Sequence, residues 1–512
     1  MALKIIMLLV FFCIMLGVGF YCRRHATDVN SFVLGGRSVG PWLTAFAYGT
    51  TYFSAVLFVG YAGQFGWKYG LSVVWAGLGT ALLGSLMAWV VLGRRTRLMT
   101  HHFGSTTMPE YFSARFDSKS LKIVASMIVF IFLIPYTASL YNGLSRIFAM
   151  AFNIDFSYCI IIMAILTGIY VIAGGYMATA INDLVQGIIM IGGIIAVVVA
   201  VLKTNGGLLA SIDALSKITD ESVSLQPGVF TSLLGPDPIG LLGVLILTSL
   251  GTWGLPQMVQ KFYAIKDEKA IGKGTVISTV FAVIIACGCY FMGSFGRLFT
   301  TAEAVKANGY DYIIPTMLSH LPDALIGLVV ILVLSASMST LSSLVMTSAT
   351  TLTLDFIKPL SKKNLDDKRQ LLTIRLLIVF FILVSVVIAV LQYKANVTFI
   401  AQLMGISWGA LAGSFLAPFF YGLYWRRATK LAVFVNFGFS SLLMVLNMLF
   451  RSSFPKLLAS PINCGAFAML AGFIIVPLVS AITKAPDERL VDGAFASIGK
   501  KPLVNAVCEP SV

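Results

Sequence analysis

The segment ASMSTLSS, residues 336–343, decides how the rest of this sequence is interpreted. It lies within the apolar run LIGLVVILVLSASMSTLSSLVMTSATTLTLDF, residues 325–356, which is long enough for a helix to cross a bilayer. Ser335, Ser339, Ser342 and Ser343 are spaced by four, three and one, so they share one face of that helix. Such a hydroxyl stripe either bonds back to its own helix and allows close helix packing, or supplies oxygen ligands to a cation.

The composition places this stripe in a membrane protein. Hydrophobic residues make up 58% of the 512 residues and charged residues only 11%, against about 25% charged in a soluble globular protein. The net charge of +15 does not indicate a nucleic-acid partner. The basic residues lie in short loops between apolar segments, as expected for the cytoplasmic loops of a membrane protein.

About thirteen apolar segments are long enough to span a bilayer. The first is retained as a membrane helix and is not a signal peptide, because Arg23 and Arg24 follow it and it is about 18–20 residues long. The expected spans are 3–22, 40–65, 71–93, 121–150, 157–175, 180–202, 238–262, 272–298, 312–355, 371–392, 397–425, 430–450 and 461–483.

The distribution of basic residues predicts the orientation. With the N-terminus outside, the segments on the cytoplasmic side, the one with Lys261 included, contain 26 of the 36 Lys and Arg residues. An odd number of spans then places the C-terminal tail in the cytoplasm. The expected location is the cell (inner) membrane, as a multi-pass protein.

Two spans contain residues that interrupt a helix. In LTAFAYGTTYFSAVLFVGYAGQFG, residues 43–66, Gly49 precedes Thr50 and Thr51, and in LTSLGTWGLPQMVQKF, residues 247–262, Gly254 precedes Pro256. At membrane depth an interrupted helix persists where it is buried in protein or lines a wet cavity. A pair of such helices in corresponding halves is typical of a transporter binding site, although glycines in membrane helices also serve packing.

An acidic residue and the hydroxyl stripe together suggest a cation site. Asp183 lies in an apolar segment, where a carboxylate is costly and is expected either to cap a helix N-terminus or to act on a ligand. Sodium is a hard cation that prefers oxygen ligands, and hydroxyls with free backbone carbonyls supply them. No nucleophile–base pair or metal-binding cluster of histidine and cysteine is visible, so an enzyme is not expected.

Several motifs in one order resemble the sodium/solute symporter family, which contains bacterial proline, pantothenate, sialate and sugar cotransporters. The resemblance implies an all-α integral membrane protein with the five-plus-five inverted-repeat core of a leucine transporter and one extra N-terminal helix. It also implies that the chain is a symporter and not an enzyme. The motifs are FVLGGRSVGPWLTA, MPEYFSARF, GGYMATAINDLVQG, GLPQMVQKFYA, ASMSTLSS and GLYWRRA, between residues 32 and 428.

The resemblance implies one or two bound sodium ions. The first would be held by backbone carbonyls at Thr50 and Phe53, by the Ala336 carbonyl and by the Ser339 and Thr340 hydroxyls. A second sodium, used by some sialate-type members, would be held by the residues at matching positions, which are Asp183, Ser339, Ser342 and Ser343.

The expected solute is a small carboxylate or amino acid, with a pantothenate-like compound ranked before proline. Proline-type members carry an aspartate at the position of Tyr52 and a tryptophan at the position of Val56. They also place an aromatic pair before the proline of the second interrupted helix, where this chain has Thr248 and Thr252. The motifs TTYFSA, GLP and IKDEKAIGKG are closer to those of pantothenate-type members. The expected solute-binding residues are Tyr52, Ser54, Tyr136, Thr252 and Trp253.

The predicted function is sodium-coupled import of such a solute by alternating access, by a chain that acts as a monomer in the lipid bilayer. A proton-coupled symporter of the same fold and a solute sensor are the alternatives, and the tail after about residue 484 is short for a signalling domain. The expected parts are an extra helix in 1–25, a first repeat in 40–203, an extracellular loop in 204–237, a second repeat in 238–428, two peripheral helices in 429–483 and a cytoplasmic tail in 484–512.

Overall fold

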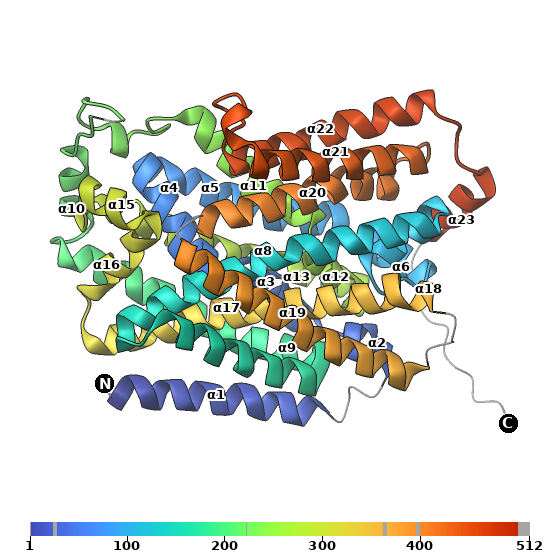
Figure 1. Ribbon diagram of the computed structural model, residues 1–512, viewed down its shortest axis with the longest axis horizontal. Helices are drawn as coiled ribbons and strands as arrows, with labels where there is room; N and C mark the ends of the chain where they lie inside the picture. Colours follow the sequence, from blue (N-terminus) through green and yellow to red (C-terminus); the bar gives the residue numbers. More distant parts are fainter. Residues whose placement is uncertain (1, 24–27, 222, 362–365, 396–399, 500–512) are drawn as a thin grey trace.

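The computed structural model describes residues 2–23, 28–221, 223–361, 366–395 and 400–499. Residues 500–512 of the expected tail lie outside the described residues, as do Arg24 and Lys362. Within the described ranges the chain forms helices joined by loops, and the long helices run along a common direction (Figure 1). Their shared direction and apolar surfaces are those of a membrane-spanning bundle.

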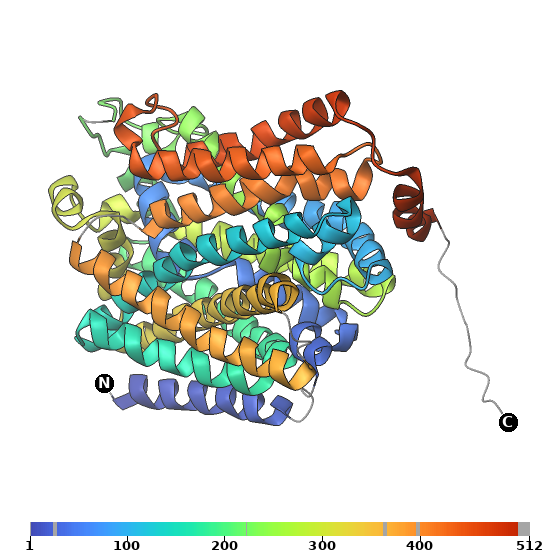
Figure 2. The same ribbon diagram turned by 45° about the vertical axis from the view of Figure 1, so that its right-hand side comes forward.

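The long helices are arranged in layers around one buried helix. α1 lies at one side of the bundle beside α9, and α21 and α22 lie at the opposite side, next to α20 (Figure 1, Figure 2). α17 lies between these layers and contacts α9, α8, α19 and α3. The bounds are α1 (Ala2–Cys22), α3 (Pro41–Tyr52), α8 (Lys119–Phe152), α9 (Phe156–Thr204), α11 (Pro238–Gly254), α12 (Pro256–Ala264), α13 (Glu268–Ala282), α17 (Asp323–Thr351), α19 (Asp367–Ala395), α20 (Ile400–Tyr424), α21 (Lys430–Leu449) and α22 (Pro461–Ile482).

The number of spans agrees with the sequence expectation. Among the described residues, ten helices meet the length and hydropathy of a membrane span, or eleven with one bent pair. Two of them, Val56–His102 and Ile160–Thr204, are 47 and 45 residues long, about twice what a bilayer requires. Both change direction at a glycine with positive φ, Gly70 (φ 61°) and Gly175 (φ 58°). Dividing them at these glycines gives thirteen spans.

The first expected helix break is present. α3 ends at Tyr52, Phe53 has extended backbone angles (φ −96°, ψ 117°), and helical structure resumes in η3 (Val56–Tyr61). Ser54 stabilises the restart, because its hydroxyl accepts a hydrogen bond from the Val56 amide at 3.2 Å. The break leaves carbonyls near the end of α3 without partners in the regular helical ladder.

The second expected break separates α11 from α12 by a bend of 45°. Leu255 is extended (φ −83°, ψ 121°), and Pro256 begins α12, where its missing amide hydrogen costs no helical bond. Gly254 allows the close approach of α20 at this point, since a Cβ there would lie 2.8 Å from the Leu416 nitrogen. The bend is therefore fixed by proline chemistry and by packing.

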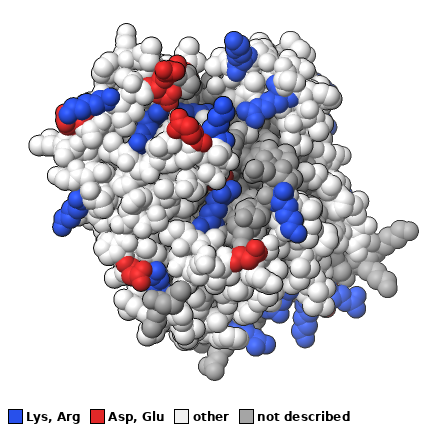
Figure 3. Space-filling view, turned by 60° about the vertical axis from the view of Figure 1, so that its left-hand side comes forward, with Lys and Arg blue, Asp and Glu red and all other residues white. Residues whose placement is uncertain are grey.

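The two ends of the bundle differ. Short helices α10 (Leu208–Ser216), α15 (Ala302–Asn308) and α16 (Ile313–Ser319) cover the end at which α1 begins, and α23 (Glu488–Gly499) lies at the other end (Figure 1). Acidic and basic side chains are interspersed on the surface of the former end (Figure 3). There Arg297 pairs with Asp220 at 2.8 Å and donates to the Trp67 carbonyl at 2.8 Å.

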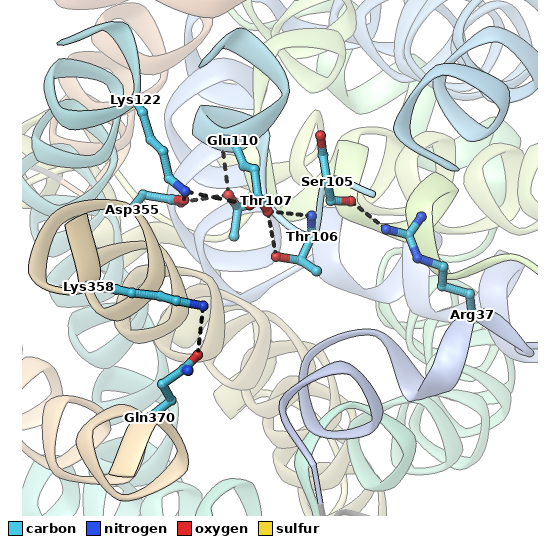
Figure 4. A network of polar contacts seen from close by, with 9 residues as sticks. All are labelled: Arg37, Ser105, Thr106, Thr107, Glu110, Lys122, Asp355, Lys358 and Gln370. Atoms are coloured by element: carbon cyan, nitrogen blue, oxygen red, sulfur yellow. Dashed lines mark hydrogen bonds and ion pairs between the residues drawn. The ribbon is translucent and has the colours of Figure 1, made fainter. Parts of the chain in front are cut away.

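A polar network joins three helical segments at the end that carries α23 (Figure 4). The buried carboxylate of Asp355, in η11 (Leu352–Ile357), lies 3.2 Å from the Lys122 ammonium and accepts a hydrogen bond from the Thr107 hydroxyl at 2.6 Å. Glu110, in α7 (Met108–Phe116), lies 3.5 Å from the same ammonium and accepts two bonds from Thr106. The network ties α7 and α8 to the continuation of α17.

Candidate functional site

The residues of the first expected sodium site meet where α17 passes the break after α3. The Ser339 and Thr340 hydroxyls lie 2.9 Å and 3.2 Å from the Thr50 carbonyl oxygen. Thr340 also lies 3.1 Å from the Thr51 carbonyl, and both hydroxyls are 3.1 Å from the Ala336 carbonyl. Segments almost 290 positions apart in the sequence thus share one cluster of oxygen atoms.

Each element supplies its oxygens for a local reason. The end of α3 at Phe53 leaves the carbonyls of the last turn available, and the regular helix of α17 puts Ser339 and Thr340 on the face toward α3. All of these residues are buried, and Phe53 lies beside Ala336 in the wall of a small cavity. The sequence left open whether these hydroxyls bond to their own helix or serve a cation. In the structure the Ser339 and Thr340 hydroxyls bond to their own helix and also to the facing segment.

The donor set fits a sodium ion. Every group in the cluster is an uncharged oxygen, and a hydroxyl that now donates to a carbonyl keeps two lone pairs that can turn toward a cation. No lysine or arginine contact to these oxygens occurs among the described residues. The chemistry is that of a hard monovalent cation held by carbonyls and hydroxyls.

The second expected set shares Ser339 with the first and extends about one turn further along α17, to Ser342 and Ser343. Asp183 is fully buried within α9, two turns beyond Gly175, so it does not cap a helix N-terminus. Neither of its carboxylate oxygens has a hydrogen-bond partner among the described residues. Ser342 donates to the Ser339 carbonyl at 2.8 Å, and the Ser343 hydroxyl lies 2.9 Å from that of Thr51.

Lys261 was missed in the sequence and lies at this second set. The sequence placed it among the cytoplasmic basic residues, but its side chain is buried in α12, with 3% of the residue exposed. Its ammonium donates to the Ser343 hydroxyl at 3.0 Å and lies 5.2 Å from the centre of the Tyr176 ring. A signal was present, since Lys261 follows the helix-breaking Pro256 by only five residues.

Two of the expected solute-binding residues lie around an aromatic residue that the sequence did not identify. The ring of Trp408, in α20, lies 5.5 Å from that of Tyr52 and 6.0 Å from that of Tyr136. The Tyr52 hydroxyl donates to the Thr248 carbonyl and lies 3.0 Å from the Thr80 hydroxyl. No local pattern marks Trp408, because α20 has no break next to it.

The other expected solute residues are divided between two places. Ser54 lies in the break beside Phe53. Thr252 and Trp253 instead reach η5 (Thr80–Met87), where the Thr252 hydroxyl donates to the Gly84 carbonyl at 2.9 Å and the Trp253 indole to the Leu83 carbonyl at 2.8 Å. These two residues fix α11 against η5 in this conformation.

The space beside the break is closed. The cavity between Phe53, Ser54 and Ala336 has a volume of about 10 Å³, close to the minimum for a single water molecule. A solute therefore enters only when the helices around the break move apart.

The chain is similar to known membrane transporters over most of its length. The family model described as "Sodium:solute symporter family" matches residues 32–436. A sodium/proline symporter of Staphylococcus aureus (strain JH9) is 29% identical over 497 residues, which cover 94% of this chain and 93% of the relative.

Solved structures show the same fold. A Na⁺-coupled sialic acid symporter in a substrate-bound outward-open state has a TM-score of 0.71 at 18% identity and covers 95% of this chain and 99% of its own. Mhp1 in an inward-facing conformation has a TM-score of 0.51 at 12% identity, with 89% and 94% covered. The described helices thus have the leucine-transporter-like architecture that was expected.

Proposed function

Because the chain belongs to the sodium:solute symporter family and is a sodium-coupled symporter of multi-pass membrane architecture, we propose that its coupling ion binds at the break after α3. The ligands are the carbonyls of Thr50, Phe53 and Ala336 and the hydroxyls of Ser339 and Thr340. The observation that carries this proposal is the convergence of both hydroxyls on the Thr50 carbonyl, at 2.9 Å and 3.2 Å.

This position explains how an ion is coupled to movement. The oxygens come from an interrupted helix and from the continuous helix α17, so an ion shared between them holds the two together. A ligand shifts a conformational equilibrium only by its difference in affinity between the states. Opening the contact between α3 and α17 separates the ligands, and the site therefore favours the conformations in which the two helices touch.

The solute is proposed to bind between Tyr52, Ser54, Tyr136 and Trp408. Around these residues the described side chains offer aromatic faces and hydroxyls, and the buried hydroxyl of Tyr136 has no hydrogen-bond partner among them. Such a surface suits a small organic solute with an apolar part and hydrogen-bonding groups. Thr252 and Trp253 join the site when α11 moves away from η5.

A pantothenate-like carboxylate is ranked before proline as the solute. The relative from S. aureus is named a sodium/proline symporter. However, by the resemblance to the family, proline-type members carry an aspartate at the position where this chain has Tyr52. Uptake of labelled pantothenate and of labelled proline into proteoliposomes distinguishes the two. The true solute, added without label, should also inhibit uptake of the labelled compound at a lower concentration than the other compound does.

Sodium-driven uptake by purified protein in proteoliposomes tests the function itself. With a sodium gradient at fixed pH, the transported compound accumulates, and without sodium on either side uptake falls to that of empty liposomes. Uptake that follows a proton gradient in sodium-free buffer would instead establish the proton-coupled alternative.

We further propose that residues 40–203 and 238–428 form the two inverted repeats, and that the monomer acts in the inner membrane with its N-terminus outside.

Replacement of Tyr52 by phenylalanine is expected to raise the KM for the solute about 3- to 10-fold with little effect on the sodium requirement. The change removes one neutral hydroxyl, which contributes about 0.5–1.5 kcal/mol. The matched control is Tyr421→Phe, because the Tyr421 hydroxyl also donates to a backbone carbonyl, that of Phe473 at 3.0 Å, and lies outside the proposed site. Equal effects of the two variants would remove Tyr52 from the solute site.

A further inference from the structure

We propose that the ammonium of Lys261 is the cation of the Asp183 and Ser343 site, and that the chain consequently binds one sodium ion. This inference rests on the proposed function, because it concerns the ion stoichiometry of that symporter. It concerns the second sodium expected from the resemblance to sialate-type members, and it leaves the first sodium site unchanged.

Lys261 contacts a residue of the expected ligand set. The Lys261 ammonium donates to the Ser343 hydroxyl at 3.0 Å. The lone pairs of that hydroxyl face a positive charge, and the same oxygen lies 2.9 Å from the Thr51 hydroxyl. Two of the positions around Ser343 are thus already taken by groups of the protein.

This part of the protein contains one buried acidic group and one buried basic group. Asp183 and Lys261 are both buried, and neither carboxylate oxygen of Asp183 has a hydrogen-bond partner among the described residues. One carboxylate balances one monovalent cation. A sodium ion on Ser343 would lie within a few ångströms of the ammonium, where two like charges away from water repel strongly.

Asp183, Lys261 and Ser343 come from three different helices. Asp183 belongs to α9 and Lys261 to α12, the half of the broken helix pair that follows Pro256, while Ser343 belongs to α17. A lysine carried by the chain has the charge of sodium but cannot leave. Its ammonium contacts the Ser343 hydroxyl of α17 and lies 5.2 Å from the centre of the Tyr176 ring of α9. Its charge is not released to the cytoplasm in each cycle.

The second expected ligand set therefore does not fit a sodium ion in this chain while Lys261 is present. Ser339 then serves the first site alone. The consequence is a coupling ratio of one sodium ion per solute molecule.

Binding of radioactive sodium to the purified full-length protein tests this inference without knowledge of the solute. The number of ions bound at saturation is measured at pH 8.5 for the unmodified protein and for Lys261→Met. We expect one ion for the unmodified protein with a Hill coefficient near one. Lys261→Met should bind a second ion, and the double variant Lys261→Met/Asp183→Asn should return to one.

Controls separate the possible failures. Lys266→Met removes a half-exposed lysine just beyond α12 and should leave one bound ion. Two ions bound to the unmodified protein would overturn the inference while supporting the proposed function, and a total absence of sodium binding would overturn the proposed function itself. An unchanged single ion in a folded Lys261→Met protein would also overturn the inference. If Lys261→Met does not fold, the count for the unmodified protein decides.

Discussion

Replacement of Ser339 by alanine is expected to raise the sodium concentration needed for half-maximal uptake by about 10- to 100-fold. The hydroxyl lies 2.9 Å from the Thr50 carbonyl and belongs to the proposed sodium ligands. A hydrogen bond or ligand contact to a charged group contributes about 1.5–3 kcal/mol, and each 1.4 kcal/mol corresponds to a factor of ten. Thermal stability in the absence of sodium should change little, because the lost side chain is small.

The matched control is Ser337→Ala. Ser337 lies on the same helix and is fully buried, but its hydroxyl has no hydrogen-bond partner among the described residues. Its removal should leave the sodium requirement within about twofold, a change below about 0.5 kcal/mol. A Ser339→Ala variant with the sodium dependence of the unmodified protein would move the coupling ion away from α17.

Replacement of Asp355 by asparagine is expected to lower the free energy of unfolding by about 3 kcal/mol. The side chain of Asp355 is fully buried, and that of its partner Lys122 is 16% exposed. After the substitution, Glu110 at 3.5 Å is the remaining anion beside the Lys122 ammonium. Removal of one partner from a buried pair typically costs about 3–5 kcal/mol. The effect should lie at the lower end of this range because Lys122 keeps a partner.

Unfolding of the purified protein by an SDS titration measures this loss. Asp213→Asn is the control, because Asp213 pairs with Lys217 at 2.6 Å on an exposed helix where both side chains are mostly solvated. Exposed pairs of this kind contribute little to stability. If both variants unfolded alike, the network of Figure 4 would not stabilise the contact of α7 and α8 with η11.

The sequence predicted the features that depend on neighbouring residues. The spans follow from hydropathy, because a helix in lipid must be apolar over about 20 residues. The breaks at Phe53 and Leu255 follow from glycine and proline near them. The hydroxyl stripe on α17 follows from helical periodicity alone.

The partners of these features could not be predicted from local patterns. Trp408 lies more than 350 positions from Tyr52, and Lys122 more than 230 positions from Asp355. A lysine near the end of an apolar span has the same local signature whether it reaches water or turns inward. For Lys261 only the packing of α12 against α17 decided between the two.

The sequence by itself therefore determined that this is a helical membrane protein with two interrupted helices and a face of hydroxyls, since these properties depend on composition, period and backbone chemistry within one segment. The tertiary structure alone decided which oxygens share a cluster and which cation lies beside Asp183. Those relations depend on the distances between helices that are remote in the sequence. Such distances are set by the packing of two helix surfaces against each other, and a single segment of sequence supplies only one of the two surfaces.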